Sequence, residues 1–163
     1  MPGRSAICAT WPSIHAAGAL ASFRRALALD ETAAGADPTS AQARLDVSAD
    51  LENLGAALLR AGRLVEAEAG FRRALELRER LSSEDPANAE VRAGFVSLFA
   101  NLGQLEAQRG AAARGKAAAA SCSRAREWHD KALRLEQEGV VLLPEAKEAL
   151  RHLASDLVRC PTP

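Results

Sequence analysis

The segment from Gly110 to Ala117 nearly matches a phosphate-binding loop and is the clearest candidate for chemistry in this chain. Such a loop needs Gly-x4-Gly-Lys followed by Ser or Thr, whose hydroxyl ligates magnesium, and it must follow a buried strand. Gly115 and Lys116 are in register here, but Ala117 replaces the hydroxyl residue and the segment follows a predicted helix. We therefore favour a flexible linker, and a nucleotide-dependent enzyme is the weaker alternative.

Cysteine and histidine occur in two pairs that are candidates for metal binding. Cys122 and His129 are seven residues apart, and His152 and Cys160 are eight apart. Neither separation is a recognised zinc spacing. No local motif indicates a Ser-His-Asp or Cys-His catalytic arrangement. We therefore predict no metal, no cofactor and no catalytic residue, which means that the protein is not an enzyme.

The same region contains a locally basic stretch, made up of Arg109, Arg114, Lys116, Arg124 and Arg126. It could contact RNA, a phosphate or an acidic partner, but no aromatic side chain is interleaved for stacking on bases, so a solvated loop is favoured. Over the whole chain, 21 Lys and Arg balance 21 Asp and Glu. No long-range field then attracts nucleic acid or an anionic membrane, and we predict neither as a partner.

The cysteines bear on the cellular compartment. Cys8, Cys122 and Cys160 are odd in number and far apart, whereas a secreted scaffold of this size would carry an even and dense set. The stretch from Met1 to His15 lacks the continuous apolar core of a signal peptide, and no apolar run approaches the ~20 residues that span a bilayer. These features predict the reducing cytoplasm.

An internal repeat organises the elements around these residues. Residues 22–62 agree with residues 70–110 at 15 of 41 positions, a spacing of 48, and share Phe-Arg-Arg-Ala-Leu, Asp-Pro and Asn-Leu-Gly. A period in the range of ~20–50 residues is typical of stacked units that bury their apolar faces on each other. A binding solenoid is therefore expected before an enzyme pocket.

Composition and hydrophobic spacing predict an all-α fold. Only 4% of residues are aromatic, none is Tyr, and Ala is abundant, which favours closely packed helices over a sheet. Apolar residues at steps of three and four predict helices over about 14–34, 39–61, 64–82, 87–109 and 144–158, the last as a terminal cap. Residues 1–14 are expected to be a disordered tail, and 15–160 one repeat domain with an Ala-rich insertion at about 110–123.

The middle repeat unit carries a family pattern. Leu51, Leu54-Gly55 and Leu58 are followed by Ala67, Phe71 and Ala74, and this order resembles the tetratricopeptide repeat. The resemblance implies an α-hairpin solenoid in which Phe71 fills the gap beside the small residues. The long 48-residue period looks like the arrays at the C-terminal ends of some bacterial Ser/Thr protein kinases. A regulatory remnant of such a signalling protein is therefore the alternative to a scaffold or adaptor.

In tetratricopeptide arrays the first helix of each hairpin lines a concave surface that binds a peptide or partner protein. By that resemblance, the partner-binding groove would show Glu52, Asn53, Ala56, Arg60, Ser97, Asn101, Gln104 and Gln108. The two Asn residues either contact the partner or tie helix to helix through backbone hydrogen bonds, and both interpretations stay open.

The first repeat unit lacks a leading helix, so its apolar face has no cover in the sequence. We expect Leu20, Phe23 and Leu27 to leave an exposed patch, with self-association through this N-terminal edge.

Overall fold

Over residues 6–160 the regular structure consists of six helices, which confirms the prediction of an all-α fold. The structure is a computed structural model that describes the backbone of residues 6–160 and the side chains of residues 18–160. No strand occurs in this part of the chain. The helices are, in chain order, α1 (Ala6–Ala36), α2 (Ala41–Arg60), α3 (Leu64–Glu84), α4 (Ala89–Ala112), α5 (Gly115–Gln137) and α6 (Pro144–Leu157).

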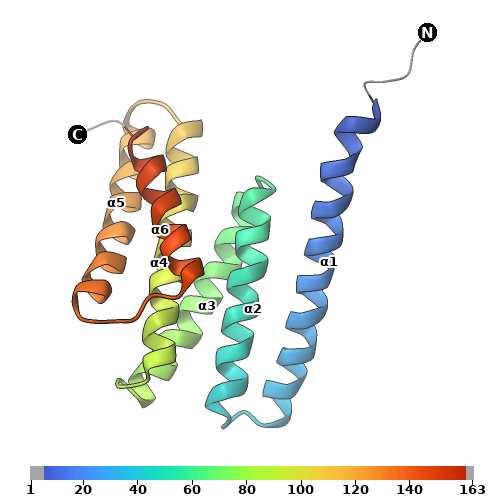
Figure 1. Cartoon of the computed structure of the whole chain (residues 1–163), viewed down its shortest axis with the longest axis vertical. Coiled ribbons are helices and arrows are strands. Elements are labelled where there is room, and N and C mark those ends of the chain that lie inside the picture. Colours follow the sequence, from blue (N-terminus) through green and yellow to red (C-terminus); the bar gives the residue numbers. More distant parts are fainter. Residues whose placement is uncertain (1–5, 161–163) are drawn as a thin grey trace.

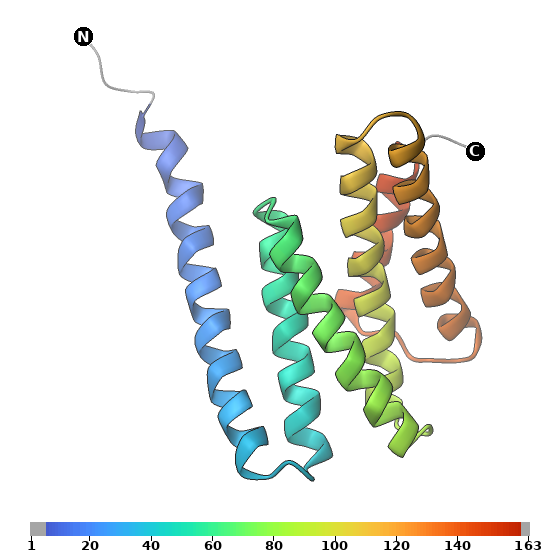
Figure 2. The ribbon, with the colours of Figure 1, turned by 180° about the vertical axis from the view of Figure 1, so that it is seen from behind.

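Helices α1 to α5 form a row in which each packs against the next (Figures 1 and 2). The connections are short, so neighbours alternate in direction and α2, α4 and α6 all run the same way (Figure 1). Helix α6, predicted as the terminal cap, packs mainly against α4 and less against α5. It therefore lies beside the predicted groove and not only at the end of the row.

Repeated capping residues set the starts of α2 and α4. Ser40 and Asn88, which are 48 residues apart, each accept hydrogen bonds from backbone N–H groups of the first turn, at 3.2 Å from Ala43 and at 3.0 and 3.1 Å from Val91 and Glu90. Because both helices begin at equivalent positions, the residues predicted for the groove are carried in the same register on each.

Gly62 follows the C-terminal end of α2 and lets the chain turn. Its φ of 74° is left-handed, and the N–H of Arg63 donates to the Leu58 carbonyl at 2.9 Å, which closes the turn into α3.

The flexible linker favoured within the predicted insertion at about 110–123 is wrong, because most of these residues are helical. Helix α4 continues to Ala112 and α5 starts at Gly115, leaving only a two-residue turn. Alanine is the best helix former, and small side chains let the two helices approach closely. A β-carbon added to Gly110 would lie 2.8 Å from the Cys122 sulfur, so the helices pack closely at Gly110, Ala118 and Cys122, which are buried.

The predicted tail over residues 1–14 is also shorter than expected. Helix α1 begins at Ala6 and passes Pro12, so 6–14 are helical, while 1–5 lie outside the described residues. A proline inside a helix removes one hydrogen bond and bends the helix without having to end it.

Phe71 lies at the centre of the main core. It is fully buried, with Ala67 and Ala74 of its own helix also fully buried, and its ring rests on Gly55 of α2. This contact holds α2 and α3 together as an antiparallel hairpin.

The patch expected at the N-terminal edge is not exposed. Leu20 is buried, and Phe23 and Leu27 are partly buried against the main core cluster, because α1 lays this face on α2. The structural basis for the predicted self-association is therefore removed.

Candidate partner-binding groove

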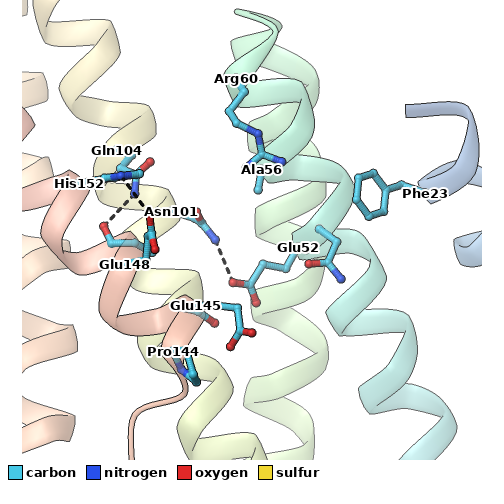
Figure 3. Close-up of a pocket in the computed structure, with 13 residues that line it drawn as sticks. Phe23, Glu52, Ala56, Arg60, Asn101, Gln104, Pro144, Glu145, Glu148 and His152 are labelled. Atoms are coloured by element: carbon cyan, nitrogen blue, oxygen red, sulfur yellow. Dashed lines mark hydrogen bonds and ion pairs between the residues drawn. The ribbon is translucent and has the colours of Figure 1, made fainter. Parts of the chain in front are cut away.

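A groove of about 500 Å³ lies between α2, α4 and α6 and reaches Phe23 of α1 (Figure 3). Seven of the eight residues predicted for the binding surface line it: Glu52, Asn53, Ala56, Arg60, Ser97, Asn101 and Gln104. The eighth, Gln108, lies elsewhere. The volume of the groove is in the range of small-ligand and peptide sites.

One wall of the groove was missed by sequence reasoning and comes from α6. Its lining residues are Pro144, Glu145, Glu148, Ala149 and His152. Pro144 occupies the first turn, where its missing N–H costs no hydrogen bond. The side-chain N–H of Gln104 donates to the Ala149 carbonyl at 2.9 Å, which ties this wall to α4.

Leu153 explains why α6 lies here. It is fully buried, and its side chain fills the space over Gly103, where an added β-carbon would collide with it. Helix α5 aligns with α3 when each residue of α3 is matched with the residue 58 positions later. In this alignment the counterpart of Phe71 is His129. The hollow that Phe71 fills at Gly55 is therefore filled at Gly103 by a side chain from α6.

Glu52 was predicted to contact a partner, but it is committed to the protein's own interior. Its carboxylate accepts a hydrogen bond from Arg78 at 2.6 Å. It accepts another from the side-chain amide of Asn101 at 2.9 Å, which Figure 3 shows. The Arg78 and Glu52 side chains are only 4% and 9% exposed. Arg78 also donates to the Gly94 carbonyl at 2.6 Å, so one guanidinium links α2, α3 and α4.

The two Asn residues differ in role. Asn101 ties α4 to α2 through the Glu52 carboxylate, which is a side-chain partner and not the backbone partner we considered. Asn53 is exposed in the groove, and no hydrogen bond to its side chain is present among the described residues.

Gln108 lines a smaller hollow of about 100 Å³ that contains a disulfide between Cys122 and Cys160. The bond joins α5 to the residues just after α6, and the Cα atoms are 5.6 Å apart. The prediction of a reducing compartment assumed unpaired cysteines, whereas a disulfide is typical of oxidising compartments. The pairing was not predicted because the two cysteines are far apart in the sequence, and they meet only because α6 folds back beside α5.

The two candidate chemical motifs are not supported by their surroundings. Lys116 is the second residue of α5 and the preceding element is α4, so the Gly-Lys segment lacks the strand that a phosphate-binding loop follows. Because Cys122 and Cys160 are bonded to each other, neither supplies a thiolate for zinc. The described residues hold no group of three or more His, Cys, Asp or Glu side chains placed to bind a metal.

A hollow of about 270 Å³ lies between α3, α4 and α5 and contains an ion-pair network. Glu68 pairs with Arg109 and Arg72, and buried Glu106 pairs with Arg109 and Arg124. The hydrogen bond from Arg109, followed by that from Arg72, lowers the pKa of Glu68 from its ordinary value of 4.5 to about 2. Both carboxylates are occupied, so the network joins helices and leaves no free base in this hollow.

Over residues 6–160, no helix combines the length and apolar character needed to cross a bilayer. Comparisons with protein-family models, with curated proteins and with solved structures found no match to this chain.

Proposed function

We propose that this chain is a non-catalytic interaction module with a tetratricopeptide-like arrangement of helical hairpins, which binds a segment of another protein in the groove between α2, α4 and α6. The observation that carries the proposal is the convergence of seven predicted residues from two repeat units on one groove. The resemblance to the tetratricopeptide repeat selected these residues, and all seven line one groove in the fold.

The chemistry of the groove also supports binding over catalysis. Its buried carboxylate, that of Glu52, is held by Arg78 and Asn101 and is not free to act as a base. Asn53, Ser97, Asn101 and Gln104 supply amide and hydroxyl groups, which pair well with a peptide main chain. Phe23, Ala56 and Pro144 provide apolar surface between them.

Site-specific photo-crosslinking in host lysate tests the proposal. A photoreactive benzoyl-phenylalanine at position 53 faces the groove, whereas the same residue at Glu79 is exposed on α3 outside it. We expect discrete protein adducts from position 53 that are missing from position 79, with both variants keeping wild-type helicity. Adducts from position 79 alone, or equal patterns from both, would contradict a groove-based function.

A further inference from the structure

Two charged side chains of the groove are unpaired, and they lie at its opposite ends. Arg60 is the last residue of α2, Glu145 is the second residue of α6, and both are exposed. Neither takes part in a hydrogen bond or ion pair among the described residues. Since α2 and α6 run in the same direction, the end of one and the start of the other fall at different levels, as Figure 3 shows.

The other two carboxylates of the groove, those of Glu52 and Glu148, lie beside basic side chains of the protein itself. Glu52 is neutralised by Arg78. On the α6 wall, the Glu148 carboxylate is 3.6 Å from a ring nitrogen of His152 one turn later, and His152 lies towards the Arg60 end (Figure 3). Arg60 therefore places an unpaired positive charge at one end of the groove, and Glu145 places an unpaired negative charge at the other.

Between the charged ends, the floor offers acceptors to a peptide backbone. The amides of Asn101 and Gln104 each use an N–H within the protein, to Glu52 and to the Ala149 carbonyl. Their side-chain carbonyl oxygens are not used in these two bonds. Such oxygens pair with the N–H groups of an extended chain.

The length of the groove sets the spacing of a complementary segment. Arg60 lies eight residues after Glu52 on α2, which is about 12 Å along a helix at 1.5 Å per residue. An extended peptide rises about 3.4 Å per residue and shows every second side chain on one face, so residues i and i+4 lie about 14 Å apart on the same side. Figure 3 shows Glu145 at the level of Glu52, so Arg60 and Glu145 are also separated by about 12 Å along α2, which is close to this peptide spacing.

We infer that the groove selects an extended internal segment of a partner protein that carries a basic and an acidic side chain four residues apart. The acidic side chain meets Arg60, and the basic one meets Glu145. This inference rests on the proposed function and adds to it the charge and spacing of the partner. Complementary charges of this kind raise specificity and association rate more than affinity.

Peptide selection tests the inference with the whole protein. A random heptapeptide library displayed on phage, fused at the peptide C-terminus so that no terminal carboxylate is present, is panned against the wild type at low ionic strength. We expect enriched sequences with Lys or Arg four positions from Asp or Glu. Arg60→Glu should lower the affinity for a peptide selected on the wild type about tenfold. When the library is panned against this variant, the enriched sequences should carry a basic residue in place of the acidic one. Panning against Glu145→Arg should enrich sequences with an acidic residue in place of the basic one.

The controls are Glu79→Arg and Arg80→Glu, charge reversals on exposed α3 positions outside the groove. Both should leave the selected sequences unchanged. Arg60 and Glu145 also interact favourably with the dipoles of their helix ends. Loss of that interaction would change the stability of the protein but not the peptide sequences that are selected. Enrichment without the charge pair, or selections unaltered by Arg60→Glu and Glu145→Arg, would overturn the inference while leaving groove binding intact. Enrichment of no peptide would overturn both.

Discussion

The ring of Phe71 rests directly on Gly55, so closely that a β-carbon at position 55 would lie 2.6 Å from the ring atom Cε1. Phe71 is fully buried and cannot swing into solvent. The separation of α2 from α3, and with it the floor of the groove, therefore depends on the missing side chain of one glycine.

Gly55→Ala should lower the free energy of unfolding by about 2 kcal/mol, because overpacking a core costs more than the gain in helix propensity returns. Guanidinium unfolding followed by circular dichroism measures this. Gly18→Ala, where an added β-carbon meets nothing within 4 Å, is the matched control and should be neutral or slightly stabilising. Equal effects of the two changes would show that the Phe71 contact does not limit helix approach.

Arg78→Met should destabilise the fold by about 3–5 kcal/mol, because it leaves the Glu52 carboxylate buried without its cation. The double variant Glu52→Leu with Arg78→Met removes both charges and should recover much of that loss. A double-mutant cycle from unfolding curves measures the coupling. Strictly additive effects would mean that the two side chains do not form a pair.

Reduction of the disulfide should destabilise the protein by about 4 kcal/mol, the chain-entropy value for a bond between residues 38 apart in sequence. Unfolding with and without a dithiol reductant measures the change. In the Cys122→Ser, Cys160→Ser variant the reductant should have no effect, since Cys8 alone remains. An identical midpoint for the oxidised and reduced wild type would contradict the assignment.

Glu68 should make a contribution to the free energy of unfolding that is lost in acid. Arg109 holds the pKa of Glu68 down to about 2 in the folded protein, against an ordinary value of 4.5. Its stabilising contribution is complete above about pH 4.5 and is lost as the pH falls towards 2. Glu68→Gln should therefore destabilise at pH 7 by about 1–2 kcal/mol and should differ less from the wild type at pH 3. A difference that is equal at both values would contradict the pairing; exposed Glu79→Gln is the control.

The helices were predictable because their signals are local. The step of three and four in residues 43–58, the caps at Ser40 and Asn88 and the left-handed Gly62 all depend on neighbours in the chain. The residues predicted for the groove came from the tetratricopeptide resemblance, which assigns the concave surface to the first helix of each hairpin, and the 48-residue repeat places Asn53 and Asn101 at equivalent positions on α2 and α4.

The missed features depend on contacts between distant segments. The α6 wall exists because Leu153 fills the space at Gly103, where the 58-residue register offers only His129 in place of a second Phe. The absence of a second Phe at position 129 was visible in the sequence. It could have indicated that a side chain from another helix packs on Gly103. The burial of Glu52 could not be predicted from its own helix, because its partner Arg78 approaches from α3.

The most direct test of groove binding is a ¹⁵N NMR titration with a peptide identified by crosslinking at position 53. The side-chain amide signals of Asn53, Asn101 and Gln104 report from inside the groove, and those of Gln42 and Gln137 report from exposed sites outside it. We predict that the first three signals shift with the peptide concentration while the last two stay in place. Shifts confined to Gln42, Gln137 or other positions away from α2, α4 and α6 would contradict the account.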